Sequence, residues 1–351
     1  MKKLRIAIAG AGLIGRAHQL RIEGSNECEL IGYADPSPAA EGVASAAGVP
    51  LYKDIASMLD QQKPDGVILA TPNTLHVSGA IECLQRGVPV LVEKPVAESF
   101  EAAVELVHAQ ARTQVPVLVG HHRRHSSFLE TARKLISDGK LGKLVAINCT
   151  ALFYKPDSYF SNGPWRTKAG GGPILINLVH EIDCMRALAG DVSEVQAFSS
   201  NAIRGFEVED TAAISLRFAN GALGTFIVSD TAATPNSWEQ TTGEDRAFAH
   251  YKNQSCYLIA GDRGSLSVPS MRSFRYPEER SWNNMMEEVR LDSPESDPLL
   301  NQLAHFCQVI KGNVAPKVSV VDGAKTLQVV ELIAKAAKTG ERLVVPAWDI
   351  D

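Results

Sequence analysis

The sequence predicts an α/β protein with two domains: an N-terminal Rossmann domain with a doubly wound parallel sheet, and a C-terminal α+β domain with a large, mostly antiparallel open sheet. Three observations predict this class. The chain has 351 residues, enough for two domains. Its first third alternates short apolar runs with helical stretches. After about residue 122 the apolar runs lengthen and often alternate with polar residues.

Five apolar runs in the first domain, residues 1–122, are predicted as strands; they are residues 4–10, 28–35, 65–71, 88–95 and 115–121. Helical patterns separate several of them, at Ile14–Ser25, Thr74–Arg86 and Ser99–Thr113. Continuous apolar strands alternating with helices indicate a parallel sheet that is covered on both faces.

The second domain, residues 123–351, has longer strand patterns, at 143–154, 194–203, 211–230 and 255–269. Asn220-Gly221 lies inside one of them and predicts a hairpin. The last helix, residues 321–339, ends before Gly340, which suits a C-cap, and it is a candidate to pack back toward the N-terminal domain.

The composition narrows the class of protein. Hydrophobic residues make up 45% and charged residues 21%, as in ordinary globular proteins. The net charge of -5 does not indicate nucleic acid or a membrane surface as a partner. No run approaches the ~18 apolar residues of a membrane span, and Arg16 and His18 interrupt the apolar N-terminus too early for a signal peptide. The six cysteines form no CxxC, which predicts reduced thiols in a cytoplasmic protein.

The segment GAGLIG places Gly10, Gly12 and Gly15 as GxGxxG between a strand and a helix. The pattern alone is weak, but in this position the glycines permit a tight turn and the close approach of a pyrophosphate to the helix N-terminus. The alternative is a glycine-rich turn in a domain that binds no dinucleotide.

Asp35 ends the second strand about 20 residues after the glycines, where a carboxylate accepts hydrogen bonds from an adenosine ribose. It would repel a 2′-phosphate, and no Arg or Lys follows in DPSPAAEG. The sequence therefore favours NAD over NADP as the cofactor.

Two further segments, ATPNTLH (70–76) and VEKP (92–95), follow strands of the parallel sheet, where ligands bind. Together with the glycines, Asp35 and the later GGG…H with an Asp three residues on, they make the chain resemble the Gfo/Idh/MocA oxidoreductase family. The resemblance runs from Leu4 to the closing AAKTGERLVV. It implies hydride transfer between a nicotinamide and a hydroxyl-bearing carbon, commonly on a sugar or cyclitol, in a homodimer or homotetramer formed through the C-terminal sheet.

The resemblance also implies the site residues. Lys94 matches the catalytic lysine, Pro95 follows a cis peptide, and His180 matches the active-site histidine. The positions expected to contact the cofactor are Gly10, Gly12, Leu13, Ile14, Gly15, Asp35, Thr71, Pro72, Asn73, His76, Glu93 and Lys94.

Lys94 suits the chemistry because oxidising an alcohol requires a group that takes the hydroxyl proton. A general base works best with a pKa near the working pH, so a lysine must be lowered from about 10.4. Partial burial beside a cationic nicotinamide would do this. The alternative is a surface lysine in a turn before proline.

The stretch GGGPILINLVHEID, residues 170–183, reads as a buried helix that carries His180. Many relatives have an Asp four residues before the histidine, one helical turn away; here that position is Ile176. Asn177 points about 60° away from His180 on a helix and is interpreted as a neutral, substrate-binding orienter. Lys94 would then handle the proton while His180 hydrogen-bonds the reacting oxygen. The alternative for His180 is a core histidine bonded to the backbone, and Asp183 is expected to have a structural role.

The resemblance implies an Arg near cofactor and substrate just after the last parallel strand, where Arg124 is the closest match, ahead of Arg123 and His122. Tyr154, Trp165 and Arg166, which precede the glycine run at 170–172, are further substrate-binding candidates. A ring and a guanidinium suit a polar ring or a carboxylate, although the segment also fits a solvated basic loop. Three histidines in GHHRRHSS invite a metal interpretation, but their spacing fits no single helix face and no metal is expected.

The long polar connection 231–256 is interpreted either as a lid bearing Trp238, His250 or Tyr251, or as a surface insertion. The preferred function is an NAD-dependent dehydrogenase of a sugar, cyclitol or similar polyhydroxylated ring. The alternatives are a dehydrogenase or reductase of a non-sugar substrate, such as a cyclic dihydrodiol, an imine or an amino-sugar ketone, and a non-catalytic nucleotide-binding regulator.

Overall fold

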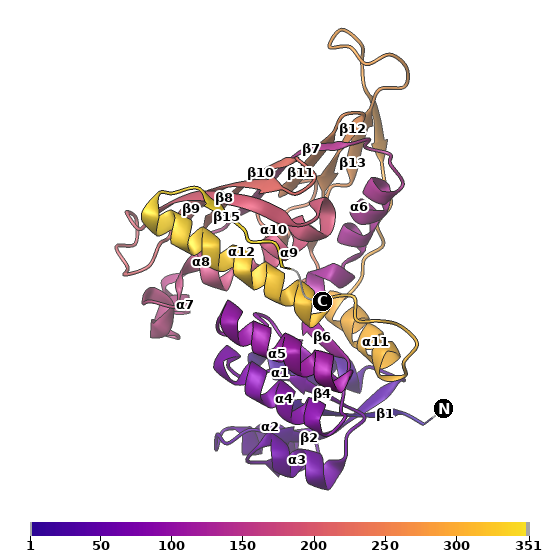
Figure 1. Cartoon of the computed structure of the whole chain (residues 1–351), viewed down its shortest axis with the longest axis vertical. Coiled ribbons are helices and arrows are strands. Elements are labelled where there is room, and N and C mark those ends of the chain that lie inside the picture. The colour runs from indigo at the N-terminus through magenta and orange to yellow at the C-terminus, as the bar shows by residue number, and fades with distance from the viewer. Residues whose placement is uncertain (1, 349–351) are drawn as a thin grey trace. The chain divides into compact units, whose positions relative to one another are not determined.

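A computed structural model describes residues 2–348 (Figure 1). The chain divides into two compact units. The first contains residues up to His125 together with Asp297–Leu327, and the second contains Ser126–Ser296 with the chain from Gln328 onward. The predicted domain boundary after residue 122 stays a proposal. The sequence did not indicate that Asp297–Leu327 would belong to the first unit.

Six strands form the sheet of the first unit: β1 (Leu4–Ala9), β2 (Cys28–Ala34), β3 (Leu51–Tyr52), β4 (Gly66–Leu69), β5 (Val90–Glu93) and β6 (Val117–Gly120). They are parallel and lie in the order β3-β2-β1-β4-β5-β6. Every residue of β4, β5 and β6 is buried, which explains their continuous apolar sequences. The predicted doubly wound parallel sheet is confirmed.

The helices of the first unit are α1 (Leu13–Glu23), α2 (Ala40–Ala46), α3 (Ile55–Gln62), α4 (His76–Gln85), α5 (Phe100–Thr113) and α11 (Pro298–Ile310), with short 3-10 turns η1 (Asn73–Leu75) and η2 (His122–His125). Side-chain caps begin two of them. Asp54 accepts a hydrogen bond from Ser57 N at the start of α3, and Ser99 accepts one from Ala102 N at the start of α5.

Helix α11 belongs to the first unit although it lies almost 300 residues along the chain. A Cβ on Gly66, the first residue of β4, would meet side chains of Phe306 and Ile310, so the glycine admits this helix. Arg21 of α1 and Asp297 at the start of α11 form an ion pair of 2.9 Å. The division between the units falls within α12 (Val320–Thr339), after Leu327.

Nine strands form the sheet of the second unit: β7 (Leu144–Leu152), β8 (Val192–Ser200), β9 (Thr211–Phe218), β10 (Leu223–Ser229), β11 (Tyr257–Gly261), β12 (Gly264–Val268), β13 (Arg272–Arg275), β14 (Glu287–Arg290) and β15 (Leu343–Val344). Their order is β14-β13-β12-β11-β7-β10-β9-β8-β15. β7 and β10 pair in parallel and the other pairs are antiparallel. This confirms the predicted, mostly antiparallel sheet, and the predicted Asn220-Gly221 turn joins β9 to β10.

The remaining helices are α6 (Ser127–Ser137), α7 (Asp157–Ser161), α8 (Gly172–Ile176), α9 (Leu178–Ala189) and α10 (Trp238–Thr242), with the 3-10 turn η3 (Pro164–Thr167). β9 and β10 alternate buried and exposed residues, so one face of the sheet is packed and the other is open. α9 covers the packed face and is buried along almost its whole length. Among the described residues, no helix has the length and apolar character needed to cross a membrane.

Candidate active site

The turn between β1 and α1 combines tight packing with an open backbone face. A Cβ on Gly10 would collide with the backbone of Ala70, and one on Gly15 would collide with the carbonyl of Gly10. Around Gly12, in contrast, a Cβ would meet nothing within 4 Å, and the neighbouring Leu13 is 82% exposed. The first and third glycines therefore bring helix and strand together, while the second leaves room for a ligand at the helix N-terminus.

Asp35 follows β2 and braces this turn. One carboxylate oxygen accepts a hydrogen bond of 2.8 Å from Ala11 N, and the other accepts one of 2.8 Å from Ser37 N. These bonds fix the carboxylate, while its further lone pairs remain available to ribose hydroxyls. With the half-buried Ile14 inside α1, the open turn, the helix N-terminus and the fixed carboxylate fit an adenine dinucleotide.

A buried pair lies beneath the end of β5. His18 of α1 and Glu93 are almost completely buried, and His18 Nε2 lies 2.8 Å from Glu93 Oε1. Burial alone would raise the pKa of Glu93, but the hydrogen bond from His18 and the nearby cations outweigh it and lower that pKa to about 2. Sequence reasoning missed His18, although it lies three residues after the last glycine of the motif.

Lys94 comes directly after β5 and is half-buried. Its backbone N–H donates a hydrogen bond of 3.2 Å to Glu93 Oε2, so the buried carboxylate holds the backbone at this position. The peptide bond between Lys94 and Pro95 is cis, as the family resemblance implied.

His76 connects the two loops that follow β4 and β5. Its ring nitrogens lie 2.8 Å from the carbonyl oxygen of Pro95 and 2.9 Å from that of Thr71. Burial lowers the pKa of His76, and a neutral imidazole donates to one of these oxygens at a time. His76 therefore holds the two loops together from inside the unit. Pro72 and Asn73, in contrast, are exposed. Cofactor contacts by these residues stay a prediction.

The histidine- and arginine-rich turn η2 is largely buried. Arg124 Nη2 lies 3.0 Å from Asp322 Oδ2, so its guanidinium neutralises a carboxylate of α12 within the first unit. This pairing does not favour the predicted role of Arg124 in substrate binding, which stays a prediction. Burial lowers the pKa of His125 to about 2, and its ring lies against that of His305. Across residues 2–348, no group of three or more His, Cys, Asp or Glu is arranged to hold a metal ion.

The glycines before α8 let two segments of the second unit approach closely. A Cβ on Gly171 would collide with the backbone of Arg166. Gly172 has a φ of +80°, and a Cβ there would crowd the carboxylate of Glu209, which accepts a hydrogen bond of 2.9 Å from Ile174 N. Gly171 and Gly172 thus allow η3, Glu209 and the start of α8 to approach one another closely.

The stretch 170–183 is buried, but it is not the single helix predicted. α8 ends at Ile176 and α9 begins at Leu178, with Asn177 between them at φ −104° and ψ −44°. Asn often ends helices because its side chain makes competing local or tertiary hydrogen bonds, and here the side chain is held from another segment. His180 lies in the first turn of α9, and it is 9% exposed.

Three of the predicted substrate residues lie on one aromatic and cationic surface of the second unit. The guanidinium carbon of Arg166 lies 3.9 Å from the centroid of the Tyr159 ring and 5.5 Å from that of Trp165. Arg166 Nη1 also donates a hydrogen bond to the Tyr159 carbonyl oxygen. Trp165 and Tyr154 are both more than half exposed, and Arg204 lies 5.3 Å from the Tyr154 centroid.

Lys155 is buried beside these residues, and sequence reasoning missed it. Its Nζ donates a hydrogen bond of 2.6 Å to Asn177 Oδ1 and lies 4.9 Å from the Tyr159 centroid and 5.5 Å from that of Phe153. Burial is the main cause that lowers the pKa of Lys155 to about 8. A signal was present in the sequence: Lys155 follows a strand and precedes Pro156, the same arrangement that Lys94 has after β5.

The proposed lid residue Trp238 is wrong. Trp238 is 4% exposed, belongs to the core of the second unit, and its ring lies 5.7 Å from that of Tyr257 at 86°. The segment 231–256 folds locally around α10, whose N-cap Ser237 accepts a hydrogen bond from Gln240 N. Packing therefore takes the indole inward, whereas Tyr251 remains 45% exposed.

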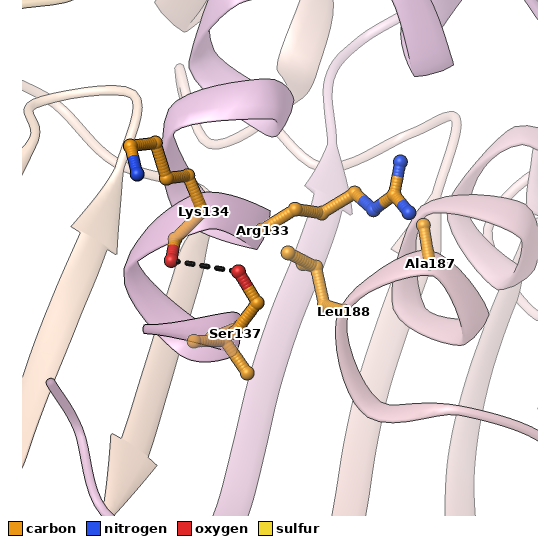
Figure 2. A pocket seen from close by; sticks show the side chains of 6 residues that line it. Arg133, Lys134, Ser137, Ala187 and Leu188 are labelled. Atoms are coloured by element: carbon orange, nitrogen blue, oxygen red, sulfur yellow. Dashed lines mark hydrogen bonds between the residues drawn. The ribbon is translucent and has the colours of Figure 1, made fainter. Parts of the chain in front are cut away.

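A hollow of about 360 Å³ lies between α6 and α9 (Figure 2). It is lined by Arg133, Lys134, Ile136, Ser137, Ala187 and Leu188. Figure 2 shows the hydrogen bond of 3.0 Å from Ser137 Oγ to the Lys134 carbonyl oxygen at its edge. No predicted site residue lines this hollow, and we assign it no function.

The N-terminal and the C-terminal parts of the chain match models of the same protein family. Residues 4–121 match the model of the oxidoreductase family with an NAD-binding Rossmann fold, GFO/IDH/MocA. Residues 129–267 match the model of the GFO/IDH/MocA C-terminal domain.

Individual relatives share only about a quarter to a third of their residues with this chain. The chain is 27% identical to a 1,5-anhydro-D-fructose reductase from Ensifer adhaerens over 96% of this chain and 97% of that protein. It is 32% identical to an inositol 2-dehydrogenase from Streptomyces avermitilis, but over only about half of each, 53%. The WlbA dehydrogenase of Bordetella pertussis, solved in complex with NADH and UDP-GlcNAcA, superposes with a TM-score of 0.79 at 26% identity, covering 99% of this chain and 100% of that one.

Proposed function

Because the chain belongs to the Gfo/Idh/MocA family of oxidoreductases, we propose that it transfers a hydride between NAD and the hydroxyl-bearing carbon of a sugar, cyclitol or similar polyhydroxylated ring. The names of its relatives support this substrate class, since they include an anhydrosugar reductase and an inositol dehydrogenase. When bound, the nicotinamide supplies the hydride acceptor or donor. In the proposed reaction, side chains of this protein hold the cofactor, orient the substrate and move the hydroxyl proton.

The observation that carries the proposal is the position of Lys94. It is half-buried at the carboxyl end of β5, beside the buried Glu93, at the edge of a parallel sheet where ligands bind. There its Nζ would take the proton from the substrate hydroxyl during oxidation and return it during reduction. Positioned proton transfer of this kind contributes about 10²- to 10⁴-fold to rate.

The second unit contributes the groups that orient the substrate. His180 lies in the first turn of α9 and Asn177 immediately before that helix. In the proposed reaction His180 hydrogen-bonds the reacting oxygen, and Asn177 holds a neighbouring polar group. Since Lys94 and His180 belong to different units, their meeting at one substrate is part of the proposal.

The cofactor would be held by the glycine turn and Asp35. Leu13 and Ile14 follow the turn in α1, and the fixed carboxylate of Asp35 would accept hydrogen bonds from the ribose. The same charge disfavours the 2′-phosphate of NADP. NAD is therefore the proposed cofactor, with NADP less favoured.

We also propose a homodimer or homotetramer formed through the open face of the nine-stranded sheet. Phe198, Leu223, Ile227 and Leu258 leave large apolar side chains exposed there, and exposed apolar patches of this kind mark association surfaces. A cytoplasmic location is part of the proposal, supported by six buried cysteines in a chain without a CxxC pattern.

The test is turnover with NAD and a panel of sugars and inositols, followed by NADH absorbance. The wild-type protein should produce NADH with at least one member of the panel. Lys94→Met should reduce kcat by about 10²- to 10⁴-fold, whereas Lys53→Met, which removes an exposed lysine of the same unit, should leave it unchanged. Turnover by Lys94→Met close to the wild-type rate rules out the proposed role.

A further inference from the structure

Among the described residues, Lys155 is a buried cation without a carboxylate partner. It is 5% exposed, and within residues 2–348 its polar contact is the Oδ1 of Asn177, a neutral acceptor. Asp230 and Glu239 attract its charge without forming an ion pair with it, and Asp230 is itself paired with Arg204 at 2.7 Å. A buried charge is costly unless it is paired, so such a residue indicates a function other than stability.

Arg166 shares the ring of Tyr159 with Lys155. Its guanidinium carbon lies 3.9 Å from the ring centroid, and the Nζ of Lys155 lies 4.9 Å from the same point. Within the described residues, Arg166 forms no ion pair, and its buried Nε has no hydrogen-bond partner. Lys155 and Arg166 thus both lie near the Tyr159 ring, and the Nε of Arg166 is an unsatisfied donor on the edge of the planar guanidinium. Such an edge matches a carboxylate in two-point geometry.

The contact with Lys155 determines which way the Asn177 amide points. A lysine ammonium only donates, so the atom that faces it must be the amide oxygen. The Nδ2 of Asn177 then points away from Lys155, and this half-buried side chain makes no hydrogen bond through Nδ2 to any residue between 2 and 348. Asn177 therefore presents donors, not acceptors, beside α9.

We propose that Asn177 Nδ2 and the Arg166 guanidinium bind the carboxylate of an acidic, hydroxylated ring substrate, with Lys155 as the positioning cation behind Asn177. This inference rests on the proposed function, because it names the substrate class of the same site. The observations it joins are two cations without carboxylate partners, an unsatisfied guanidinium donor and an amide turned to donate. A bound carboxylate would supply the missing negative charge and accept from both donors.

The experiment compares two matched probes, D-glucuronate and D-glucose, by calorimetry on the full chain with saturating NADH at pH 7. Wild-type protein should bind D-glucuronate at least about tenfold more tightly than D-glucose, as expected for charge-assisted hydrogen bonds. Equal affinity for the two probes, or no measurable binding of D-glucuronate, overturns the proposal. Tighter binding of D-glucose 6-phosphate than of D-glucuronate overturns the choice of a carboxylate.

Three variants test the residues. Lys155→Met should weaken D-glucuronate binding by about 10- to 100-fold while changing D-glucose binding less than about twofold. Asn177→Asp keeps the shape but gives Lys155 an internal carboxylate, so it should weaken D-glucuronate binding as well. Lys168→Met removes an exposed charge after η3 and should have no effect. If Lys168→Met weakens binding as much as Lys155→Met does, general surface charge explains the affinity and the proposal fails.

The outcomes separate this proposal from the proposed function. Lys155-dependent binding of D-glucuronate without hydride transfer on any tested ring would support the carboxylate site and reject the dehydrogenase activity. Turnover of neutral rings with no preference for acidic ones, and no effect of Lys155→Met on either, would reject the carboxylate site and leave the dehydrogenase activity standing.

Discussion

Lys155 Nζ donates a 2.6 Å hydrogen bond to Asn177 Oδ1, and this contact joins the segment after β7 to the break between α8 and α9. It holds a buried ammonium against a neutral amide. The family resemblance implies an Asp four residues before His180, but this chain has the apolar Ile176 there, and the neighbouring Asn177 brings no charge. The pair therefore carries a net positive charge next to the first turn of α9.

This burial predicts an unusual dependence of stability on alkaline pH. The pKa of Lys155 is about 8 in the folded protein against 10.5 for an ordinary lysine. Between these values the unfolded chain binds the extra proton, so the free energy of unfolding rises with pH. Below pH 8 the full penalty, roughly 3 kcal/mol, is present. Lys155→Met should thus be more stable than wild type at pH 7, by about 1–3 kcal/mol.

Urea unfolding at several pH values between 7 and 10.5 measures this difference. The advantage of Lys155→Met should shrink steadily as pH rises through this range. The exposed Lys168→Met provides the control and should show no such trend. A Lys155→Met variant that is less stable than wild type at pH 7 would mean that the ammonium stabilises the fold.

Glu93 predicts a second dependence of stability on pH, on the acid side, and here the charged form stabilises the fold. Its pKa is lowered from 4.5 to about 2, because the His18 hydrogen bond and the nearby positive charges together outweigh the effect of burial. The stabilisation is therefore present above pH 4.5 and is lost as pH falls toward 2. Glu93→Gln should lower the free energy of unfolding by about 1–3 kcal/mol at pH 7. Glutamine has one amide oxygen that accepts and one amide nitrogen that donates, so it cannot accept from both His18 and Lys94 N, and its nitrogen would face one of these two donors.

Thermal unfolding at pH 7 and pH 3 tests this prediction, with the exposed Glu41→Gln of α2 as the control. The gap between wild type and Glu93→Gln should narrow at the lower pH. A constant gap would show that the Glu93 charge does not contribute to stability.

We expect Asp35→Asn to change the preference of the protein between NAD and NADP. The substitution keeps the shape and one acceptor but removes the charge that would face a 2′-phosphate. The ratio of NADPH to NADH affinity should rise by about tenfold or more, and NADH should bind more weakly because one brace of the glycine turn is lost. Fluorescence titration of both nucleotides measures this without a substrate. An unchanged ratio would assign the discrimination to another group.

We expect Phe198→Glu to change the oligomeric state of the protein. The Phe198 side chain is 70% exposed on the open face of β8, where a neighbouring copy would cover it in the proposed assembly. A charge there should shift the protein toward monomer in sedimentation experiments, because burying it unpaired is costly. Ile203→Glu, at a side chain 76% exposed in a turn outside the sheet, is the control. A wild-type monomer, or an oligomer that Phe198→Glu leaves intact, contradicts the proposed surface.

Local sequence was sufficient for the parallel sheet and its glycine turn. Continuous apolar runs between helices allow one layered arrangement, and the spacing of Gly10, Gly12 and Gly15 has meaning only between a strand and a helix. The same holds for the Asn220-Gly221 hairpin and for the helix end at Gly340, whose φ is +73°. These features depend on residues that are close together in the chain.

Contacts between distant segments required the tertiary structure. The pairing of His18 with Glu93 spans 75 residues and that of Lys155 with Asn177 spans 22, and neither leaves a periodic pattern in the sequence. Trp238 entered the core although it lies in a polar connection, and α11 joined the first unit from far along the chain. The sequence by itself determined which residues form strands, turns and the family motifs, because those depend on local propensity and spacing. Only the tertiary structure decided which buried charges have partners, because charge compensation depends on side chains that folding brings together.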